Sequence, residues 1–279
     1  MKVTIAKSAG FCFGVKRALE IAFKTAQSKE PVFMLGDIVH NEDVVDKIKK
    51  AGIKKINKLD SGKNKILLIR AHGTSKTIIE KAKKKGYKIA DATCPMVKEI
   101  HRIAQRMEKE GYKIIIMGDK YHDEVVGIMG QLNSKAIVID SLKSLPINKI
   151  KKIKKGAVVV QSTQNLEKVN KIVDFLKKYI KELKFFDTIC RPTREKQEEI
   201  KILPQFNDVM IIIGSKTSAN TKRLYEISMG LNKNTHWVES QKGLKENWFR
   251  QATTVGITAG ASTPDSTTKS IVACIKNFS

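Results

Sequence analysis

The chain has 279 residues, 41% of them apolar, and a formal net charge of +25. This length suits about two domains of ~150 residues each. Its longest apolar runs, such as Val209–Ile213, fall well short of the ~20 residues that a membrane span needs. The N-terminal residues contain no long apolar segment typical of a secretory signal. We therefore expect a cytoplasmic protein without a membrane-spanning segment.

The positive charge comes mostly from lysine. Only eight of the 53 basic residues are arginine, and aromatic residues make up 6% of the chain. Proteins that read bases favour the planar arginine side chain, and those that bind single strands stack bases on aromatic rings. Nucleic acid is therefore not the expected main partner. The charge should instead attract anions and acidic proteins.

Short β-branched segments alternate along the chain with amphipathic helical segments. This alternation predicts an α/β fold with largely parallel sheets. The expected strands are Val32–Leu35, Lys65–Ile69, Tyr87–Ala90, Lys113–Met117, Ala136–Ile139, Ala157–Val160, Lys184–Phe186, Val209–Ile213 and Thr254–Thr258.

A helix is expected directly after each of three cysteines, Cys12, Cys94 and Cys190. Two of these helices have apolar residues at helical spacing, namely Val15, Ala18, Leu19, Ala22, Phe23 and Ala26 after Cys12, and Val97, Ile100, Ile103, Ala104 and Met107 after Cys94. The segment from Pro192 to Leu203 is more highly charged and predicts a weaker helix.

The shared pattern of strand, cysteine and helix indicates three α/β units of about 90 residues. A helix N-terminus favours the thiolate form of cysteine, which is the form that ligates metals. We therefore expect Cys12, Cys94 and Cys190 to hold a metal, although their chemistry alone does not decide between iron and zinc. Cys274 lies in an apolar C-terminal segment and is expected in the core.

Six further strand-end loops carry polar residues, two in each third of the chain. They span residues 36–41, 70–74, 118–124, 161–164, 214–220 and 258–265. In α/β sheets, ligands collect beyond the carboxyl ends of the strands. Small residues, hydroxyls and histidines suit phosphate oxygens. The loops therefore predict an anion site to which His40, His72 and His122 contribute.

Together these motifs resemble the 4-hydroxy-3-methylbut-2-enyl diphosphate reductase family of the non-mevalonate isoprenoid pathway. The motifs are Gly-Phe-Cys at 10–12, Val-His-Asn at 39–41, Ala-His-Gly at 71–73, Asp-Ala-Thr-Cys-Pro at 91–95, His-Asp-Glu at 122–124, Ile-Cys at 189–190 and Thr-Ala-Gly-Ala-Ser at 258–262. The resemblance covers essentially the whole chain. It implies three α/β lobes with mostly parallel sheets, arranged pseudo-threefold around a central 4Fe–4S cluster. The lobes would be residues 13–94, 95–190 and 191–279, the last completed by residues 1–12.

The resemblance also implies the roles of individual residues. Cys12, Cys94 and Cys190 would ligate three irons of the cluster and leave the fourth iron open. The substrate would be an allylic alcohol diphosphate, reduced to isopentenyl and dimethylallyl diphosphate. Glu124 would donate a proton, supported by His122 and Ser162. The substrate contacts would be His40, His72, His122, Ser162, Ser218, Asn220 and Ser262.

This sequence departs from the family pattern at several places. Ser162 stands where relatives often have threonine, and Ala219 where some have serine. The residues after Cys190 also differ from the commoner Ala-Thr form.

No Gly-x-Gly-x-x-Gly fingerprint for a nicotinamide cofactor is present, so the expected electron donor is an acidic ferredoxin or flavodoxin. Two other interpretations stay open, a non-catalytic metal-binding or redox-sensing module with a three-cysteine site and a lysine-rich nucleic-acid binder.

Overall fold

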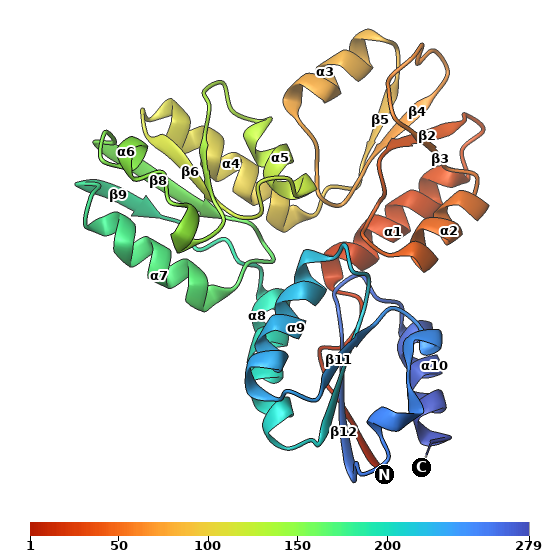
Figure 1. The fold of residues 1–279 in the computed structure, drawn as a ribbon. Coiled ribbons are helices and arrows are strands. Elements are labelled where there is room, and N and C mark those ends of the chain that lie inside the picture. The colour runs from red at the N-terminus through yellow and green to blue at the C-terminus, as the bar shows by residue number, and fades with distance from the viewer. Residues whose placement is uncertain (279) are drawn as a thin grey trace. The chain divides into compact units, whose positions relative to one another are not determined.

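The computed structural model describes residues 1–278. Within them, twelve strands form three four-stranded sheets in which every strand pairing is parallel (Figure 1). The strands are β1 Lys2–Ile5, β2 Val32–Leu35, β3 Lys54–Ile56, β4 Ile66–Ile69, β5 Lys88–Asp91, β6 Lys113–Met117, β7 Ile137–Ile139, β8 Lys155–Val160, β9 Glu182–Phe185, β10 Val209–Ile213, β11 Thr235–Val238 and β12 Thr254–Ala259. The predicted α/β class with parallel sheets is confirmed.

Ten α-helices lie within the described residues, nine of them between strands and α10 after the last strand. They are α1 Phe13–Ala26, α2 Glu42–Lys50, α3 Lys76–Lys84, α4 Pro95–Lys109, α5 Asp123–Met129, α6 Ile147–Ile150, α7 Leu166–Lys177, α8 Arg191–Ile202, α9 Ala219–Leu231 and α10 Asp265–Lys276. None of the described helices is long and apolar enough to cross a membrane.

The chain divides into two compact units. Unit 1 contains Met1–Lys16, Val39–Lys47 and the residues from Arg191 on. Unit 2 contains Arg17–Ile38 and Ile48–Cys190. Unit 1 therefore holds one of the three sheets, and unit 2 holds the other two.

The three sheets have the same strand order. The orders are β3-β2-β4-β5, β7-β6-β8-β9 and β11-β10-β12-β1. The third sheet repeats the pattern only because β1, from the start of the chain, takes the place that β5 and β9 hold in the others. Lys2 to Ile5 pair in register with Thr254 to Ile257, and Figure 1 shows β1 running beside β12.

In the second sheet, alternate residues of each strand face opposite helices. Ile115 and Val158 pack in a core cluster with Ile172 of α7. Their strand neighbours Ile114 and Val159 pack on the other face in a cluster with α4 and α5. Side chains of a strand point alternately to the two faces, so both faces are covered when every position is apolar. This is why strands such as Lys113–Met117 are almost wholly apolar, as expected for buried parallel strands.

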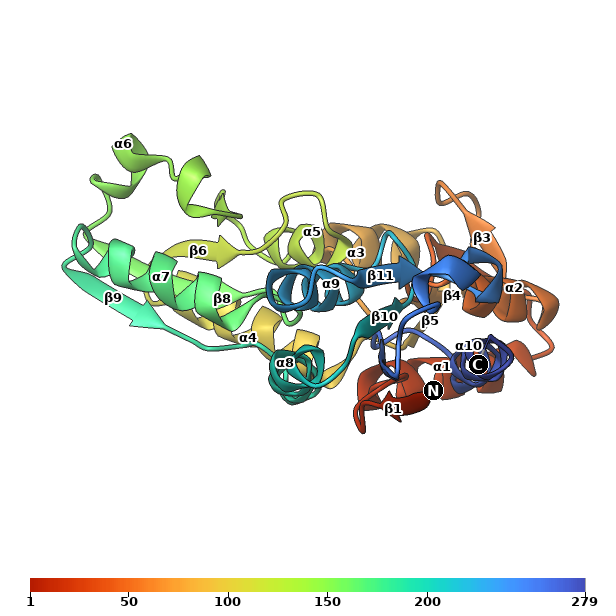
Figure 2. The same cartoon turned by 60° about the horizontal axis from the view of Figure 1, so that its bottom comes forward.

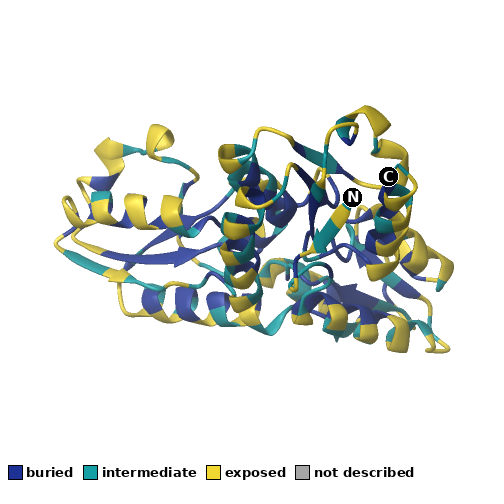
Figure 3. Cartoon of the chain, turned by 90° about the horizontal axis from the view of Figure 1, so that it is seen from below, coloured by how far each residue is buried: buried dark blue, intermediate teal, exposed yellow. Residues whose placement is uncertain are grey.

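The third sheet follows the same rule. Ile211 and Ile257 pack in a cluster with Ile271 of α10, whereas Ile212 packs with Ile200 of α8 and α9 residues on the other face. Figure 2 shows the helices lying against the sheets, and Figure 3 shows buried residues on the strands and exposed residues on the outer faces of the helices. The carboxyl ends of the strands are therefore the place where polar loops can gather.

Most predicted elements lie within two residues of their observed bounds. β2, β6 and β10 match the predicted bounds in full. The strand β3 was not predicted, because it has three residues, two of them exposed lysines. One burial prediction was wrong: Cys274 is only half-buried, because Ile271 and Ile275 supply the inward face of α10.

Candidate active site

Cys12, Cys94 and Cys190 lie in equivalent places in the three repeats. Each follows the strand at the same edge of its sheet, and each immediately precedes a helix. The backbone N–H of each cysteine donates to the carbonyl of a residue two positions beyond the neighbouring strand. These bonds run from Cys12 to Ala261 over 3.1 Å, from Cys94 to Ala71 over 3.0 Å and from Cys190 to Ser162 over 3.1 Å.

The local sequence explains why these cysteines stand at helix starts. Cys94 is the N-cap of α4, with Pro95 in the first turn, where its missing N–H costs nothing. The Lys98 N–H donates to the Cys94 carbonyl over 3.0 Å, and the Lys16 N–H donates to the Cys12 carbonyl over the same distance. All three cysteines are partly buried. Partly buried thiols at helix N-termini fit an iron–sulfur group, which is held by thiolates.

Glu124 and Ser162 form a buried polar pair in unit 2. Glu124 is in the first turn of α5 and is 2% exposed, and Ser162 follows β8 and is 7% exposed. The Ser162 N–H donates to Glu124 Oε1 over 2.6 Å, and the Ser162 hydroxyl donates to Oε2 over 2.7 Å. The strand-end loops after β6 and β8 therefore meet at one carboxyl group.

The environment of Glu124 favours its protonated form. Burial raises the pKa of the Glu124 carboxyl above its ordinary value of 4.5, and the two hydrogen bonds from Ser162 oppose this shift only in part. A carboxyl group that keeps its proton near neutral pH can serve as a general acid.

His122 and His72 lie beside this carboxyl group. His122 is the N-cap of α5, and its Nδ1 accepts the Glu124 N–H over 3.1 Å. This contact fixes the proton of the ring on Nε2 when the ring is neutral. The His72 ring meets the His122 ring edge-on, with centroids 5.4 Å apart.

An ion pair joins the loops that carry these histidines. Arg70 forms a bidentate pair with Asp123, at 2.6 Å and 2.7 Å. Arg70 precedes the His72 loop, and Asp123 is next to His122. Parallel two-point contacts of this kind fix geometry as well as energy, so the pair holds His72 and His122 in register.

Unit 1 brings together a second group of predicted residues. Ser218 is the N-cap of α9, and its hydroxyl accepts the Thr221 N–H over 3.3 Å. The Ser262 hydroxyl donates to the His40 carbonyl over 3.0 Å. Ser218 and Ser262 are 5% and 7% exposed.

Asn220 is the most informative residue of this group. It is 3% exposed, and its Oδ1 accepts the Ala261 N–H over 3.0 Å. Its amide nitrogen is buried and has no hydrogen-bond partner among the described residues. An unpaired buried donor costs about 1–3 kcal/mol, and an anion is the kind of ligand that would satisfy it.

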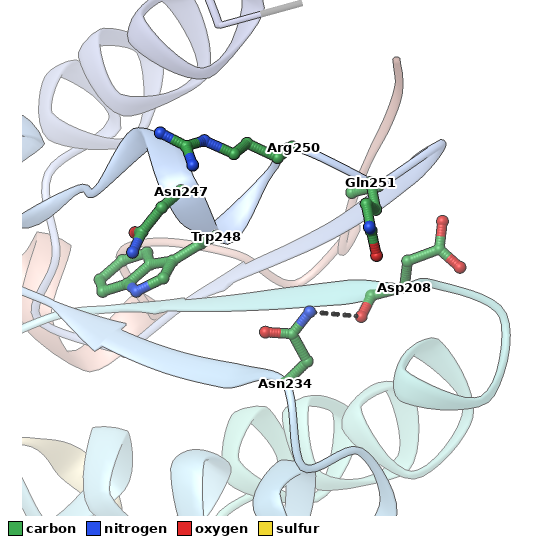
Figure 4. Close-up of a pocket in the computed structure, with 7 residues that line it drawn as sticks. Asp208, Asn234, Asn247, Trp248, Arg250 and Gln251 are labelled. Carbon is green, nitrogen blue, oxygen red and sulfur yellow. Dashed lines mark hydrogen bonds between the residues drawn. The ribbon is translucent and has the colours of Figure 1, made fainter.

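One surface cavity lies away from these residues. It has a volume of about 560 Å³ and includes Asp208, Asn234 and Gln251 (Figure 4). These residues precede β10, β11 and β12, so the cavity lies at the amino ends of the strands. Asp208 already accepts hydrogen bonds from the backbone and hydroxyls of Thr253 and Thr254, which lower its pKa to about 2. This cavity is not the predicted anion site.

The structure therefore groups the predicted residues in two sets. Unit 2 holds Glu124, His122, His72, Ser162, Cys94 and Cys190, and unit 1 holds Cys12, His40, Ser218, Asn220 and Ser262. Convergence of all of them on one cluster and one substrate stays a prediction.

Two buried polar residues near the predicted site residues, Gln161 and Lys196, were not predicted from the sequence. Gln161 is fully buried, and its Oε1 accepts the Asp119 N–H over 2.8 Å, which ties the loop after β6 to the loop after β8. Lys196 is 2% exposed, the only charged residue among the largest fully buried side chains of the described chain. It shares the buried face of α8 with Thr193, Gln197 and Ile200. That helical spacing was the available signal, but a lysine there usually indicates a solvated face.

The chain is thus an α/β protein of three parallel-sheet repeats, each with one cysteine between an edge strand and the helix that follows it. The LytB protein family model matches residues 3–276. The chain is 42% identical over 267 residues to a 4-hydroxy-3-methylbut-2-enyl diphosphate reductase of Aquifex aeolicus, covering 94% of this chain and 92% of that protein. It is 42% identical over 277 residues to the enzyme of that name from Campylobacter hominis, covering 98% of both.

Solved structures agree with these relatives. A structure of (E)-4-hydroxy-3-methyl-but-2-enyl diphosphate reductase, described as the terminal enzyme of the non-mevalonate pathway, is 40% identical with a TM-score of 0.73, covering 99% of this chain and all of the other. The reductase structure from Plasmodium falciparum is 30% identical with a TM-score of 0.89, covering 98% of this chain and 87% of the other. The chain belongs to the LytB family of 4-hydroxy-3-methylbut-2-enyl diphosphate reductases, as its motifs predicted. It is accordingly an oxidoreductase.

Proposed function

We propose that the chain reduces 4-hydroxy-3-methylbut-2-enyl diphosphate to isopentenyl and dimethylallyl diphosphate, with a 4Fe–4S cluster as its cofactor. The reaction consumes two electrons and two protons, breaks the allylic C–O bond and releases the hydroxyl as water. Family membership supports the reductase activity. The cysteines, Glu124 and Ser162 support the assignment of the cofactor and of the two products.

The observation that carries this proposal is the connection from Glu124 through Ser162 to Cys190. The side chain of Ser162 bonds the Glu124 carboxyl at 2.7 Å, and the backbone carbonyl of Ser162 accepts the Cys190 N–H at 3.1 Å. The proposed proton donor, Glu124, and the proposed thiol ligand, Cys190, are thus both hydrogen-bonded to Ser162. A sensor or a structural metal site has no need of a buried acid in that position.

We assign the cluster to the thiolates of Cys12, Cys94 and Cys190. When bound, the cluster would supply the electrons and an iron position open to the substrate hydroxyl, since three protein ligands leave one site vacant. The residues of the chain then bind, orient and protonate the substrate.

Glu124 would hold the proton that the departing hydroxyl needs. Because burial raises the pKa of Glu124, its neutral form can donate to the Ser162 hydroxyl, which lies 2.7 Å from the carboxyl. The hydroxyl group can both accept and donate, so it can pass a proton on. Ser162 therefore provides the relay that relatives with threonine also offer.

The diphosphate would be bound by His40, His72, His122, Ser218, Asn220 and Ser262. Of these, Asn220 offers a buried amide N–H that no described residue satisfies. Ser218 adds a hydroxyl at the N-terminus of the 13-residue helix α9, where the helix dipole favours negative charge.

We further propose that the electrons come from an acidic ferredoxin or flavodoxin. The net charge of +25 would attract such a carrier by electrostatic steering.

The decisive experiment uses protein purified without oxygen. Iron and sulfide are counted, and the allylic diphosphate is then offered with a chemical reductant. We expect about four irons and four sulfides per chain and release of both product diphosphates. Protein with a full cluster that leaves the substrate unchanged would instead favour the redox sensor. Protein that binds neither iron nor sulfide would refute the cluster and with it the proposed reaction.

A further inference from the structure

The loop that carries Cys12 differs from the loops that carry the other two cysteines. Cys94 comes three residues after β5, Cys190 five residues after β9 and Cys12 seven residues after β1. The Cys12 loop is thus the longest. A longer loop has more conformations to lose when it is fixed, so it needs more contacts to hold one geometry.

The two shorter loops are held by their own side chains. The Asp91 carboxylate accepts the Thr93 N–H over 2.9 Å in the Cys94 loop. In the Cys190 loop, Thr188 bonds both the N–H and the carbonyl of Val160, at 2.8 Å and 2.6 Å.

The Cys12 loop is held instead by two residues of α8. The Glu199 carboxylate accepts the N–H groups of Lys7 and Ser8, at 2.9 Å and 2.8 Å, and also the Ser8 hydroxyl. A carboxylate from another element thus does what Asp91 does within its own loop.

Lys196 holds the opposite side of the same loop. Its ammonium donates to the carbonyls of Ser8, Gly10 and Ala259, the latter two at 3.0 Å each. Ala259 also accepts the Gly10 N–H, and two residues further on Ala261 accepts the Cys12 N–H. The charge of Lys196 therefore joins the loop to the end of β12, from which Cys12 is positioned.

Burying an ammonium group is expensive unless several polar groups surround it. Three backbone carbonyls, those of Ser8, Gly10 and Ala259, offset that cost here. Such an arrangement is weak evidence for extra stability, but it demands one loop geometry, because the carbonyls must converge on one point.

We propose that Lys196 and Glu199 are positioning residues that fix the Cys12 thiol for cluster binding. They act through the backbone of residues 7–10. The hydrogen bonds given for them reach this backbone, the Ser8 hydroxyl and the Ala259 carbonyl, and none of these bonds involves Cys12. The proposal rests on the proposed role of Cys12 as a ligand. Since α8 follows Cys190 directly in the sequence, one helix then links two of the three ligand segments.

The test compares Glu199→Gln and Lys196→Met with Glu198→Gln, which changes an exposed residue of the same helix. In Glu199→Gln, the side-chain NH2 group replaces one carboxylate oxygen. This NH2 group would face the N–H group of Lys7 or Ser8, which is also a donor, so that hydrogen bond is lost. Amide hydrogen exchange of the full chain is followed by mass spectrometry. Loss of charged hydrogen bonds should speed exchange of residues 7–12 by about 10-fold or more. Peptides containing Thr93 and Ile189 should not change, and Glu198→Gln should match the original chain.

Iron release to a chelator from the reconstituted protein is the second measurement. We expect release on the order of 10-fold faster in both variants, with the original rate in Glu198→Gln. If Lys196→Met does not fold, Glu199→Gln alone carries the test. Exchange that rises equally in all three cysteine loops, or not at all, overturns the proposal. Faster exchange limited to residues 7–12 with unchanged iron release overturns the link to the cluster. The exchange measurement needs neither cluster nor substrate, so its outcome is independent of the proposed reaction.

Discussion

The hydroxyl of Ser162 donates to Oε2 of Glu124 over 2.7 Å, although the two residues are 38 positions apart in the sequence. They meet because β6 and β8 are neighbours in one parallel sheet, with Met117 opposite Val160. Parallel strands bring their carboxyl ends to the same edge. The register of one sheet thus places the proposed acid, Glu124, beside the proposed relay, Ser162.

Replacing Glu124 by glutamine should lower turnover ~100-fold or more, the usual scale for loss of a general acid. The amide keeps the shape of the side chain and removes its acidic proton. Iron content and diphosphate binding should stay near those of the original protein. Steady-state kinetics beside an iron assay make the comparison, and turnover close to the original would refute the role of Glu124.

The same substitution should alter the dependence of stability on pH. Because the pKa of Glu124 is raised from 4.5 in the folded chain, the folded state retains a proton that the unfolded state releases. The stability that Glu124 contributes is therefore full below pH 4.5 and falls as the pH rises towards its folded pKa. In Glu124→Gln this fall should be absent, as hydrogen exchange of α5 between pH 4 and pH 8 can measure.

Serine in place of Cys12, Cys94 or Cys190 should each deprive the protein of most of its iron after anaerobic reconstitution, since soft thiolates are the preferred ligands of such clusters. Cys274→Ser is the matched control and should retain its iron, because Cys274 lies within α10 rather than before a helix. Full iron in any of the first three variants, or its loss in the control, would contradict the assignment.

The substitution Asn220→Asp separates two roles of the Asn220 side chain. One is to accept the Ala261 N–H, and the other is the proposed donation to the diphosphate. Aspartate keeps an oxygen to accept the Ala261 N–H and replaces the buried amide donor with a negative charge. We expect inorganic diphosphate to bind at least ~10-fold more weakly, because a hydrogen bond to a charged group contributes about 1.5–3 kcal/mol. Calorimetric titration with diphosphate measures this, and unchanged affinity would remove Asn220 from the substrate site.

Ionic strength should distinguish a protein electron donor from a small chemical one. The rate with a reduced acidic ferredoxin should fall steeply as salt is added, because salt screens electrostatic steering. The rate with a neutral chemical reductant should fall little. An equal response to salt with both reductants would mean that the lysines serve only as a solvated surface.

His101 should make unit 2 sensitive to acid. Burial lowers the pKa of His101 to about 4, so the folded state binds its proton later than the unfolded state as pH falls. The stabilisation by the neutral ring is complete above about pH 6.5 and is lost as the pH falls through about 4, a change of about 3 kcal/mol. His101→Gln should weaken this dependence, as seen by exchange of amides in α4. An unchanged pH profile would exclude His101 as its source.

The positions of helices and strands could be predicted from the sequence better than the pairing of the strands. The apolar residues of α4 repeat at helical spacing and lie in the predicted helix, where they are buried, because an amphipathic pattern reports local geometry. The strand order and the β1–β12 pairing depend on contacts between distant segments, which periodicity does not encode.

The same distinction holds for the site. The family resemblance implied Cys12, Glu124 and Asn220 as site residues. The residues that hold them in place, Gln161, Lys196 and Glu199, carry no motif. Their partners are mostly backbone atoms, and such contacts leave little trace in residue spacing.

The pairing of β1 with β12 has a consequence for synthesis. Among the described strands, Lys2–Ile5 is made first and Thr254–Ala259 is made last, and these two are neighbours. The two sheets of unit 2 can close while the chain is still emerging. The third sheet must wait for the last strand, and Cys12 waits with it for the carbonyl of Ala261. On the proposed assignment of Cys12 as a ligand, its thiol therefore takes its place only after β12 and Ala261 have been made.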